Sequence, residues 1–325
     1  MALVLTRSDV RALLTAADCI RAVESAFRAL GAGEAPAPGA VGHHAPGGAF
    51  HVKVASTGPG GRYFAAKTNG NFFENAARGL PRIQGVIVLA DAANGTPLAV
   101  MDSIEITILR TAAATAVAAQ YLAPVDASVV TIAGCGVQGR AHVDAIAHVR
   151  KVREWRLFDT DAQAARTLAT YVEALGARGV VVEDLGASAR TSDIVVTCTP
   201  ARAAILDVAE VAAGAFVGAV GTDSEDKQEI APALLAASDV VVDSLDQCAT
   251  FGDLAHAIAA GVMTRGDVRA TLGEVVARGR LGRADASRPV VFDSTGIAIQ
   301  DVAAAGIVYE RAREQRCGTE IAINA

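Results

Sequence analysis

Three ionisable side chains lie at positions where their chemistry could be used. Lys67 ends the apolar run RYFAAK and is followed at once by the polar turn TNGN. Arg110 falls on the face of a helical pattern that also carries Ile106 and Val117, both typical of a protein core. Asp223 comes just after the apolar run AFVGAVG. The two cations suit the binding of a carboxylate, and a carboxyl group suits proton transfer.

Each of these residues also has a purely structural interpretation. Lys67 could be a solvated lysine that protects a strand edge. Arg110 needs an anion because an unpaired buried charge is costly, and that anion is either a nearby Asp or Glu or a substrate carboxylate. Asp223 could cap a following helix, or it could face a ligand, since open α/β sheets bind ligands at the carboxyl ends of their strands. The residues alone leave these alternatives open.

The segment TIAGCGVQGRAH contains the pattern G-x-G-x-x-G and predicts a dinucleotide site. It follows a buried strand and opens a helix, which is the context that the pattern requires. Gly134 can make the tight turn, Gly136 lets the backbone approach a pyrophosphate, and Gly139 lets the helix pack on the strand. The helix N-terminus then presents free N–H groups to the phosphates. We include Val137 and Gln138, within the same turn, in the cofactor site.

The second strand of this region ends at Asp159, where an acid can accept hydrogen bonds from the adenosine ribose hydroxyls. A 2′-phosphate would meet the negative charges of Asp159 and Asp161, and the next basic residue along the chain is Arg166. The sequence therefore favours NAD(H) over NADP(H). Thr197 and Thr199, at the end of the run DIVVTCTP, are also assigned to the cofactor site.

The elements that position these residues fall into two groups. Before residue 124 the pattern predicts a helix pair over 8–31, a Pro/Gly/His-rich loop over 34–48, four strands and a long helix. The predicted strands span residues 49–56, 62–68, 84–91 and 96–102. A hairpin joins the last two, so this region is expected to be α+β with an antiparallel sheet.

From residue 124 onward, short valine-rich runs alternate with helical patterns. Such continuous apolar strands indicate a parallel sheet covered on both faces, as in Rossmann-type folds. The predicted fold class is therefore α/β, with a Rossmann-type domain over 124–301. We expect a substrate-binding and dimerisation domain from 1–123 together with 302–325, because the final helix is expected to pack back on the first region.

Composition excludes several classes of partner. The chain of 325 residues has a net charge of −6 and a pI near 5.6, and it shows no basic block for nucleic acid or anionic membranes. Five scattered cysteines without a CxxC pair argue against a disulfide or zinc framework, so no metal is expected. The N-terminus lacks signal-peptide features and no apolar run is long enough to span a bilayer, which predicts a cytoplasmic protein.

The block from FAAKTNGNF through GLPRIQGVIVLADAANGTPLAVMDSIEITILRTAAATAVAAQYLA resembles the ornithine cyclodeaminase/mu-crystallin family. The segments GCGVQGRAH and GTDSEDKQE share this resemblance, which covers nearly the whole chain. The family includes archaeal-type alanine dehydrogenases and ketimine reductases. The resemblance implies that Lys67 and Arg110 bind the substrate carboxylate and that Asp223 handles the proton or water at the reacting carbon. Lys67 and Asp223 are thus the candidate catalytic residues.

One departure from the family pattern concerns substrate binding. The family commonly supplies another carboxylate-binding arginine before the second strand, but this chain has no arginine between Arg28 and Arg62. Lys53 or His51, which share one face of the predicted strand over 49–56, are candidates to replace it, or the substrate is held differently. Ornithine as the substrate is therefore not carried over.

The resemblance implies an NAD(H)-dependent enzyme acting at the Cα–N bond of an amino or imino acid by hydride transfer. It would be a cyclodeaminase, a dehydrogenase or a ketimine reductase, and a homodimer built through the antiparallel sheets. Mu-crystallin relatives suggest an alternative, a non-catalytic NAD(P)H-dependent protein that binds a small ligand. Asp223 argues against this alternative, since a carrier needs no proton-handling acid.

Overall fold

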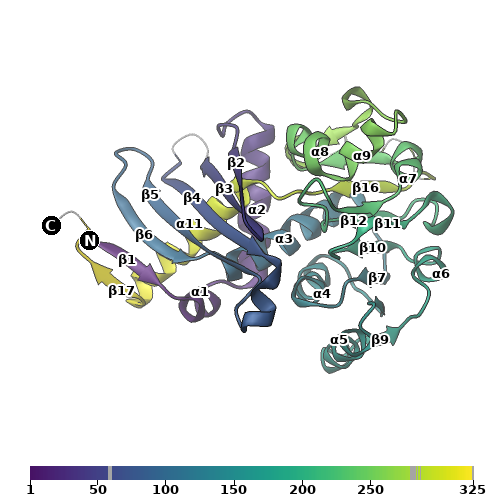
Figure 1. The fold of residues 1–325 in the computed structure, drawn as a ribbon, viewed down its shortest axis with the longest axis horizontal. Coiled ribbons are helices and arrows are strands. Elements are labelled where there is room, and N and C mark those ends of the chain that lie inside the picture. Colours follow the sequence, from purple (N-terminus) through teal and green to yellow (C-terminus); the bar gives the residue numbers. More distant parts are fainter. Residues whose placement is uncertain (58–60, 279–282, 284, 286, 324–325) are drawn as a thin grey trace. The chain divides into compact units, whose positions relative to one another are not determined.

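The computed structural model describes residues 1–57, 61–278, 283, 285 and 287–323, and it divides into two compact units (Figure 1). Unit 1 comprises Met1–Arg110 and Ile297–Ala325, and unit 2 comprises Thr111–Gly296. Our expected boundaries, after residues 123 and 301, lie further along the chain. The first division falls inside α3 (Ile104–Leu122), a continuous helix in which the sequence pattern offers no break.

Unit 1 is built on a seven-stranded sheet in the order β17-β1-β6-β5-β4-β3-β2. Strands β1 and β6 are parallel and every other neighbouring pair is antiparallel, so the sheet is mixed. In sheet order the strands are β17 (Thr319–Ile321), β1 (Ala2–Leu5), β6 (Pro97–Asp102), β5 (Ile83–Asp91), β4 (Tyr63–Phe72), β3 (Gly48–Ser56) and β2 (Gly39–Ala45).

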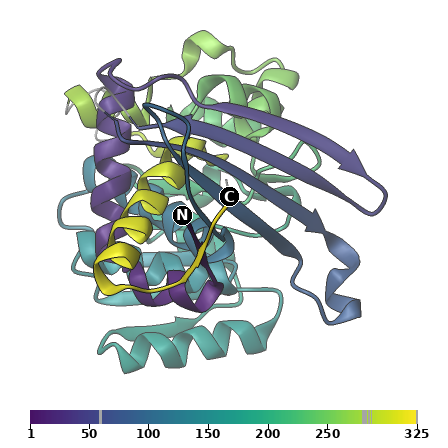
Figure 2. The ribbon, with the colours of Figure 1, turned by 90° about the vertical axis from the view of Figure 1, so that its left-hand side faces the viewer.

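Two helices cover one face of this sheet. Helix α11 packs on β3, β4 and β5 and against α2, as Figure 2 shows for the yellow and purple helices. The alternation along β4 explains the choice of face, since Tyr63 and Ala65 are buried beneath α11. Besides the start of α3, the helices of this unit are α1 (Arg7–Leu13), α2 (Ala16–Gly31), α11 (Ala298–Gln315) and the 3₁₀ helix η1 (Phe73–Arg78).

Three strands of unit 1 were not predicted. The segment 34–48 was expected to be a loop because it is rich in Pro, Gly and His, but it contains β2. Residues Gly39 to Ala45 pair in register with Val54 to Gly48 of β3, and Gly47 makes the turn with a φ of 80°. Pairing with a long neighbour thus overrides a weak local preference. Strands β1 and β17 are short and carry too little pattern to be recognised.

Unit 2 is built on eight strands, all parallel, in the order β15-β14-β16-β12-β10-β7-β8-β9. In that order they are β15 (Ala270–Thr271), β14 (Asp239–Val242), β16 (Val290–Asp293), β12 (Phe216–Ala219), β10 (Ile194–Thr197), β7 (Val129–Ala133), β8 (Glu154–Phe158) and β9 (Arg178–Val181). A separate parallel pair joins β11 (Arg202–Leu206) to β13 (Gln228–Ile230).

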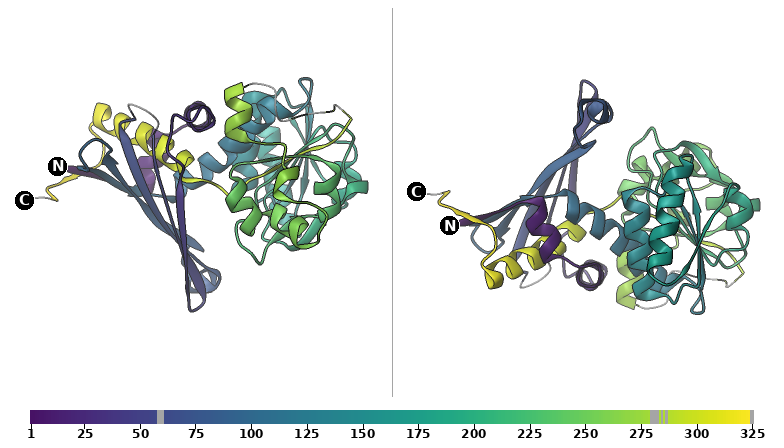
Figure 3. Two further views of the ribbon diagram at one scale, coloured as in Figure 1. Left: turned by 90° about the horizontal axis from the view of Figure 1, so that it is seen from above. Right: turned by 90° about the horizontal axis from the view of Figure 1, so that it is seen from below.

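The strand order fixes where a ligand is expected. The chain runs outward from β7 through β8 to β9 and then returns to β10 on the other side of β7. Right-handed crossovers place the helices of the two halves on opposite faces, as Figure 3 shows. Strands β7 and β10 therefore flank the topological switch point, the usual ligand position in such sheets.

The helices of unit 2 are short, and several begin at the carboxyl end of a strand. They are α4 (Val137–Val149), α5 (Ala162–Ala174), α6 (Leu185–Ala189), α7 (Pro232–Ala237), α8 (Leu245–Phe251), α9 (Asp253–Ala259), α10 (Leu272–Arg278), η2 (Val208–Glu210) and η3 (Arg265–Asp267). In the part of the chain that the structure describes, no helix combines the length and apolar character needed to cross a membrane.

Candidate active site

Lys67 lies on the helix-covered face of β4. Its side chain is only 3% exposed and follows Tyr63 and Ala65 in the buried alternation of that strand. This burial excludes the interpretation of Lys67 as a solvated edge lysine. In the sheet register Lys67 is directly opposite Lys53 of β3 and Ile87 of β5. Directly opposed like charges are destabilising unless an anion is close by.

That anion is Asp301, in the first turn of α11. The Lys67 Nζ lies 2.7 Å from its carboxylate, and the Arg110 Nε lies 3.2 Å from Oδ1 of the same group. Lys67 also reaches Thr107 Oγ1 at 3.5 Å. A carboxylate near a helix N-terminus is further favoured by the helix dipole. The ion-pair interpretation of Arg110 is therefore realised, and the structure brings Lys67 and Arg110 together on one carboxylate.

The burial and charges of this cluster bring the pKa of Lys67 close to neutral pH. Burial lowers the pKa of Lys67 to about 7; Asp301 opposes this shift, while Arg110 and Lys53 add to it. Burial alone would raise the pKa of Asp301, but the charges of Lys67, Arg110 and Lys53 outweigh it and lower that pKa. Three cations thus act on one carboxylate, which leaves the cluster suited to a second, incoming carboxylate.

Gln300, next to Asp301 on α11, completes this cluster. Arg110 donates from Nη1 to Gln300 Oε1 at 2.9 Å, and the Gln300 side chain is wholly buried. Within the described residues, Gln300 Nε2, Arg110 Nε and Asp301 Oδ2 are buried atoms without an aligned hydrogen-bond partner. Buried polar atoms are rarely left so, because each costs about 1–3 kcal/mol. Arg110 Nε and Asp301 Oδ2 are still within ion-pair distance of Asp301 Oδ1 and Lys67 Nζ, so of the three atoms Gln300 Nε2 is the donor left for a carboxylate ligand.

The glycine turn after β7 has two glycines that the fold itself requires. Gly134 has a φ of 99°, and a Cβ there would lie 2.9 Å from the carbonyl oxygen of Cys198. A Cβ on Gly139 would come 2.2 Å from the Gly134 oxygen, so the helix could not pack as it does. Gly136 differs, because a Cβ there would meet nothing within 4 Å. Open space at this glycine is what close approach of a ligand requires.

Helix α4 begins at this turn without a side-chain cap. Its N-cap is Gly136, which offers no side-chain acceptor, and Val137 at the first position is 63% exposed. Gln138 Oε1 is buried and without a hydrogen-bond partner in the described structure. The free N–H groups of such a helix end suit a phosphate. The local geometry therefore fits the pyrophosphate of a dinucleotide.

Asp159 borders the same turn. Its Oδ2 accepts a hydrogen bond from the backbone N–H of Cys135 at 2.7 Å, and its Oδ1 accepts one from Asp161 N at 2.9 Å. The Asp161 side chain caps α5 at Gln163, and Arg166 also donates to Gln163. Asp159, the acid predicted to bind the ribose, is therefore fixed next to the glycine turn. Arg166, the next arginine along the chain, donates to Gln163.

Thr197 and Thr199 direct their hydroxyl groups to a residue that the sequence did not suggest. The Thr197 Oγ1 donates to Glu229 at 2.7 Å, and Thr199 donates from both Oγ1 and the backbone N–H, at 2.7 and 2.6 Å. The N–H of Gly221 donates to the same carboxylate at 2.8 Å. Their assignment to the cofactor stays a prediction, and Glu229 is what their side chains bind in the structure.

Asp223 follows β12 in a turn, and the next helix begins only at Pro232. The helix-cap alternative for Asp223 is therefore wrong. Its carboxylate forms an ion pair with the ammonium group of Lys227, which is largely buried, while Asp223 itself is 46% exposed. An exposed carboxylate held by a buried cation is placed to exchange protons with a ligand.

Two of the missed residues carried a weak sequence signal. Gln300 and Asp301 interrupt the apolar segment GIAIQDVAAAG, and paired polar residues inside such a segment indicate a buried polar contact. Glu229 lies in the polar run SEDKQE, where nothing distinguishes a buried acid from a solvated one. Glu105 on α3 is also buried, and it binds Arg7 and Arg11 of α1. Across the described residues, no cluster of three or more His, Cys, Asp or Glu could hold a metal ion.

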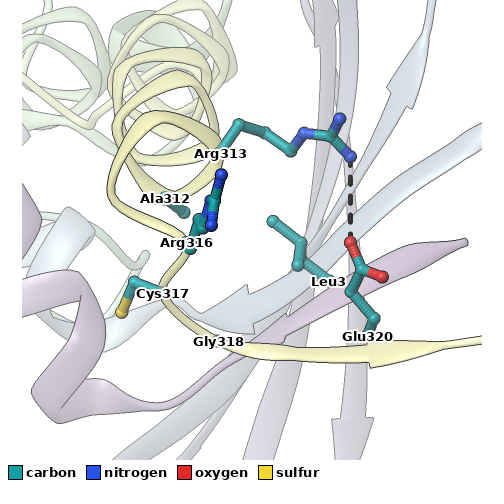
Figure 4. A pocket seen from close by; sticks show the side chains of 7 residues that line it. All are labelled: Leu3, Ala312, Arg313, Arg316, Cys317, Gly318 and Glu320. Carbon is teal, nitrogen blue, oxygen red and sulfur yellow. Dashed lines mark ion pairs between the residues drawn. The ribbon is translucent and has the colours of Figure 1, made fainter.

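A cavity of about 410 Å³ lies at the opposite end of α11 (Figure 4). Arg313, Arg316 and Glu320 line it, and Arg313 is 4.0 Å from Glu320. With a rise of about 1.5 Å per residue, Arg313 is roughly 18 Å along the helix from Asp301. This cavity is therefore separate from the Lys67 cluster, and its charged side chains are exposed.

Comparison with known proteins finds relatives that match nearly the whole chain. The sequence profile of the ornithine cyclodeaminase/mu-crystallin family matches residues 1–316. Alanine dehydrogenase of Archaeoglobus fulgidus is 35% identical over 319 residues, 98% of each chain. An archaeal alanine dehydrogenase dimer with bound NAD superposes with a TM-score of 0.95 at 34% identity, covering 99% of both chains. The Thermococcus litoralis Δ¹-pyrroline-2-carboxylate reductase in complex with NADH and L-proline gives 0.92 at 30% identity, covering 98% of this chain and 100% of that one. The predicted resemblance and fold class are confirmed.

Proposed function

This chain belongs to the ornithine cyclodeaminase/mu-crystallin family, and on that premise we propose that it is an NAD(H)-dependent enzyme acting at the Cα–N bond of an amino or imino acid. The relatives described above act, by name, on an amino or imino acid, and the two solved structures among them hold NAD or NADH. The observation that carries the proposal is the buried cluster of Lys67, Arg110 and Asp301, because it holds more cations than carboxylates.

In this proposal Arg110 and Lys67 bind the substrate carboxylate. Arg110 is held in place by Gln300 and Asp301, so its planar fork is oriented before the substrate arrives. Lys53, directly opposite Lys67, adds the positive charge that the missing arginine would have supplied. Because Lys67 has a pKa of about 7, it can also give or take a proton near neutral pH. The cluster thus holds the substrate by its carboxylate and orients the reacting carbon toward the cofactor.

The glycine turn and Asp159 hold the cofactor, which we propose to be NAD(H) rather than NADP(H). Bound there, the nicotinamide would supply hydride transfer to or from the substrate Cα. The open space over Gly136 admits the pyrophosphate, and Asp159 next to it disfavours a second phosphate by charge. Arg166, the nearest following basic residue, is bound to Gln163 and so is not available to offset that repulsion.

Asp223 is the proposed general acid/base. Its carboxylate is exposed enough to meet a ligand and is oriented by Lys227. In a dehydrogenase or imine reductase Asp223 would move the proton of the amine or activate water at Cα. In a cyclodeaminase the same residue would serve while ammonia leaves. The division of labour follows the two units, with the carboxylate cluster in unit 1 and the cofactor and acid in unit 2.

We further propose a homodimer formed through the uncovered face of the unit 1 sheet. Val86 of β5 pairs with Thr68, Thr68 pairs with Val52 and Val52 pairs with Val41 of β2, so these side chains form one row. Val41 is 68% and Val86 45% exposed, and Val88, two positions further along β5, is 39% exposed. An apolar row of this kind on a sheet face is typical of an interface.

Light scattering tests the dimer. The chain of 33.1 kDa should give twice that mass, and replacing Val86 and Val88 by Lys should give the single mass. Val181→Lys, at a similarly exposed valine of unit 2, is the matched control and should stay dimeric. A monomeric wild-type protein would exclude the proposed interface.

The five unpaired cysteines suit a reducing compartment, and on that basis we propose a cytoplasmic location.

The function is tested by a paired assay with excess NAD(H). The absorbance of NADH and the release of ammonia are followed together for ornithine, lysine, alanine and cyclic imino acids. Stoichiometric change in NADH identifies a dehydrogenase or imine reductase. Ammonia from a diamino acid without net change in NADH identifies a cyclodeaminase. Binding of NADH with no turnover of any of these compounds would replace the enzyme by a ligand-binding protein.

A further inference from the structure

We propose that Glu229 is a positioning residue whose carboxylate holds the segments after β10 and β12 in the conformation that binds the cofactor. This inference rests on the proposed function, since it assigns Glu229 to the same cofactor site. Glu229 itself is wholly buried and lies on β13, outside the eight-stranded sheet. It therefore acts through the segments that it binds and not by touching the reacting atoms.

The contacts of Glu229 join two separate segments. Its Oε1 accepts from the N–H and the hydroxyl of Thr199, and its Oε2 accepts from the Thr197 hydroxyl and the Gly221 N–H, all within 2.6–2.8 Å. Each oxygen thus has two donors, which nearly fills the capacity of a carboxylate. A Cβ on Gly221 would lie 2.5 Å from the Glu229 carboxyl carbon and 2.4 Å from the Thr199 oxygen, so only glycine fits there.

These segments lie beside the glycine turn. Thr197 is in register with Ala133 of β7 and with Ala219 of β12, so the three strands end in one row. Cys198 then donates its N–H to Ala133, and its carbonyl packs against Gly134, the first glycine of the turn. A shift of the segment around Thr199 would therefore be felt at the turn that receives the pyrophosphate. Gly221 lies between β12 and Asp223, so the same carboxylate also orients the proposed acid.

The charge of Glu229 decides how well these segments are held. Burial raises the pKa of Glu229 to about 7, the carboxyl of Asp253 on α9 adds to the rise, and the donors at Thr199 and Thr197 oppose it. Asp253 accepts from the Glu229 N–H, and His256 acts on Asp253. Burial, together with the charge of Glu229, raises the pKa of the Cys198 thiol. When Glu229 binds a proton, one carboxyl oxygen becomes an O–H donor. That O–H then faces the two donors from which the oxygen had accepted hydrogen bonds. Because these donors lower the pKa of a carboxyl that stays buried, protonation favours their release. The two segments should therefore loosen locally as the pH falls below about 7, while the fold as a whole keeps the neutral carboxyl buried.

The test is NADH binding by the whole protein without any substrate, followed by fluorescence at about pH 6 and about pH 8. For the wild type we expect weaker binding at the lower pH. Glu229→Gln keeps the size but loses the charge, and it should bind NADH about tenfold more weakly at the higher pH with little further change at the lower one. The matched control is Glu274→Gln, because Glu274 on α10 also accepts from the N–H and hydroxyl of one threonine, Thr271 of β15.

Three outcomes overturn the inference. If Glu229→Gln is folded and binds NADH as the wild type and Glu274→Gln do at both pH values, Glu229 does not position the cofactor segments. If Glu229→Gln does not fold, Thr197→Val decides, since it removes one donor and should weaken NADH binding about threefold or more. Unchanged binding by that variant also overturns it. Wild-type protein that binds NADH but turns nothing over defeats the proposed function alone, whereas wild-type protein that binds no NADH defeats both.

Discussion

Two buried carboxylates, Asp301 in unit 1 and Glu229 in unit 2, meet the same physical problem in different ways. Burial is the largest influence on the pKa of both and would raise each of them. Asp301 is surrounded by the cations of Lys67 and Arg110, and its pKa is lowered. Glu229 is surrounded by uncharged N–H and O–H donors, and its pKa is raised to about 7.

The difference shows what each region is suited to do. Cations act at a distance and can be shared, so the surroundings of Asp301 can receive the carboxylate of a substrate without being rebuilt. Neutral donors act only at hydrogen-bond distance and in fixed directions, so the surroundings of Glu229 hold backbone segments in place. In the proposed function, unit 1 would therefore recognise the charge of a substrate, whereas unit 2 would hold the backbone segments of the cofactor site in place.

The largest effect is expected when a cation is removed from the Asp301 cluster. Lys67→Met leaves Asp301 buried with one cation fewer, and removing one partner of a buried pair typically costs about 3–5 kcal/mol. We expect kcat/KM to fall about a thousandfold in steady-state assays, while NADH binding, which depends on unit 2, stays unchanged. Lys151→Met, at an exposed lysine, is the control. A Lys67→Met enzyme with wild-type kcat/KM would show that the cluster is only structural.

Removing the carboxylate should have the next largest effect. Asp301→Asn leaves Lys67 and Arg110 buried beside each other without an anion, which should lower the free energy of unfolding by about 3 kcal/mol. Because Asp301 opposes the lowering of the Lys67 pKa, its loss should also move the corresponding limb of the pH–rate profile to lower pH. Urea denaturation and a pH–kcat/KM profile measure the two effects. An unchanged profile would mean that Lys67 does not titrate during turnover.

Much of unit 2 could be predicted from sequence because its signals are local. The glycine turn and Asp159 are close along the chain, and several strands are continuous valine-rich runs. In unit 1, apolar neighbours at helix spacing predicted that Arg110 is buried. For Lys67 the residues alone left a solvated strand edge open, and the family resemblance indicated a site. What the local pattern could not give is the identity of the buried anion, since Asp301 is far from both in sequence.

Glu229 and β2 are two further features that local sequence patterns could not predict. Glu229 is surrounded in sequence by polar residues, and only the return of β13 to the ends of β10 and β12 buries it. The segment that forms β2 has loop-forming residues, and pairing with β3 alone makes it a strand. In both cases long-range contacts decide the outcome, and these are not encoded in local periodicity or propensity.

The difference between the two buried clusters can also be tested by measuring the free energy of unfolding against pH. A carboxyl with a raised pKa stabilises the folded state at low pH, and that stability is lost as pH rises from 4.5 to about 7 for Glu229. Lys67 has a lowered pKa, so its ionisation makes the free energy of unfolding rise as pH climbs from about 7 to 10.5. Urea denaturation of wild type, Glu229→Gln and Lys67→Met across pH should show each slope flattened by its own variant, with a change of about 3 kcal/mol for Glu229 and about 5 kcal/mol for Lys67. Equal slopes in all three proteins would contradict both assignments.

The smallest effect concerns Gln300, where the two kinds of surroundings meet. Its oxygen is a neutral acceptor for Arg110, and its amide nitrogen is a buried donor without an acceptor in the described structure. Gln300→Met keeps the volume but removes both groups, so Arg110 loses an orienting contact and the substrate carboxylate loses a donor. We expect KM for the substrate to rise about tenfold with kcat little changed, because binding is weakened equally in ground and transition states. Gln315→Met, at an exposed position of the same helix, should change neither. A fall in kcat without a rise in KM would instead place Gln300 among the residues that act only in the transition state. Gln300 would then act by holding geometry, as proposed for Glu229 in unit 2, and not by binding charge.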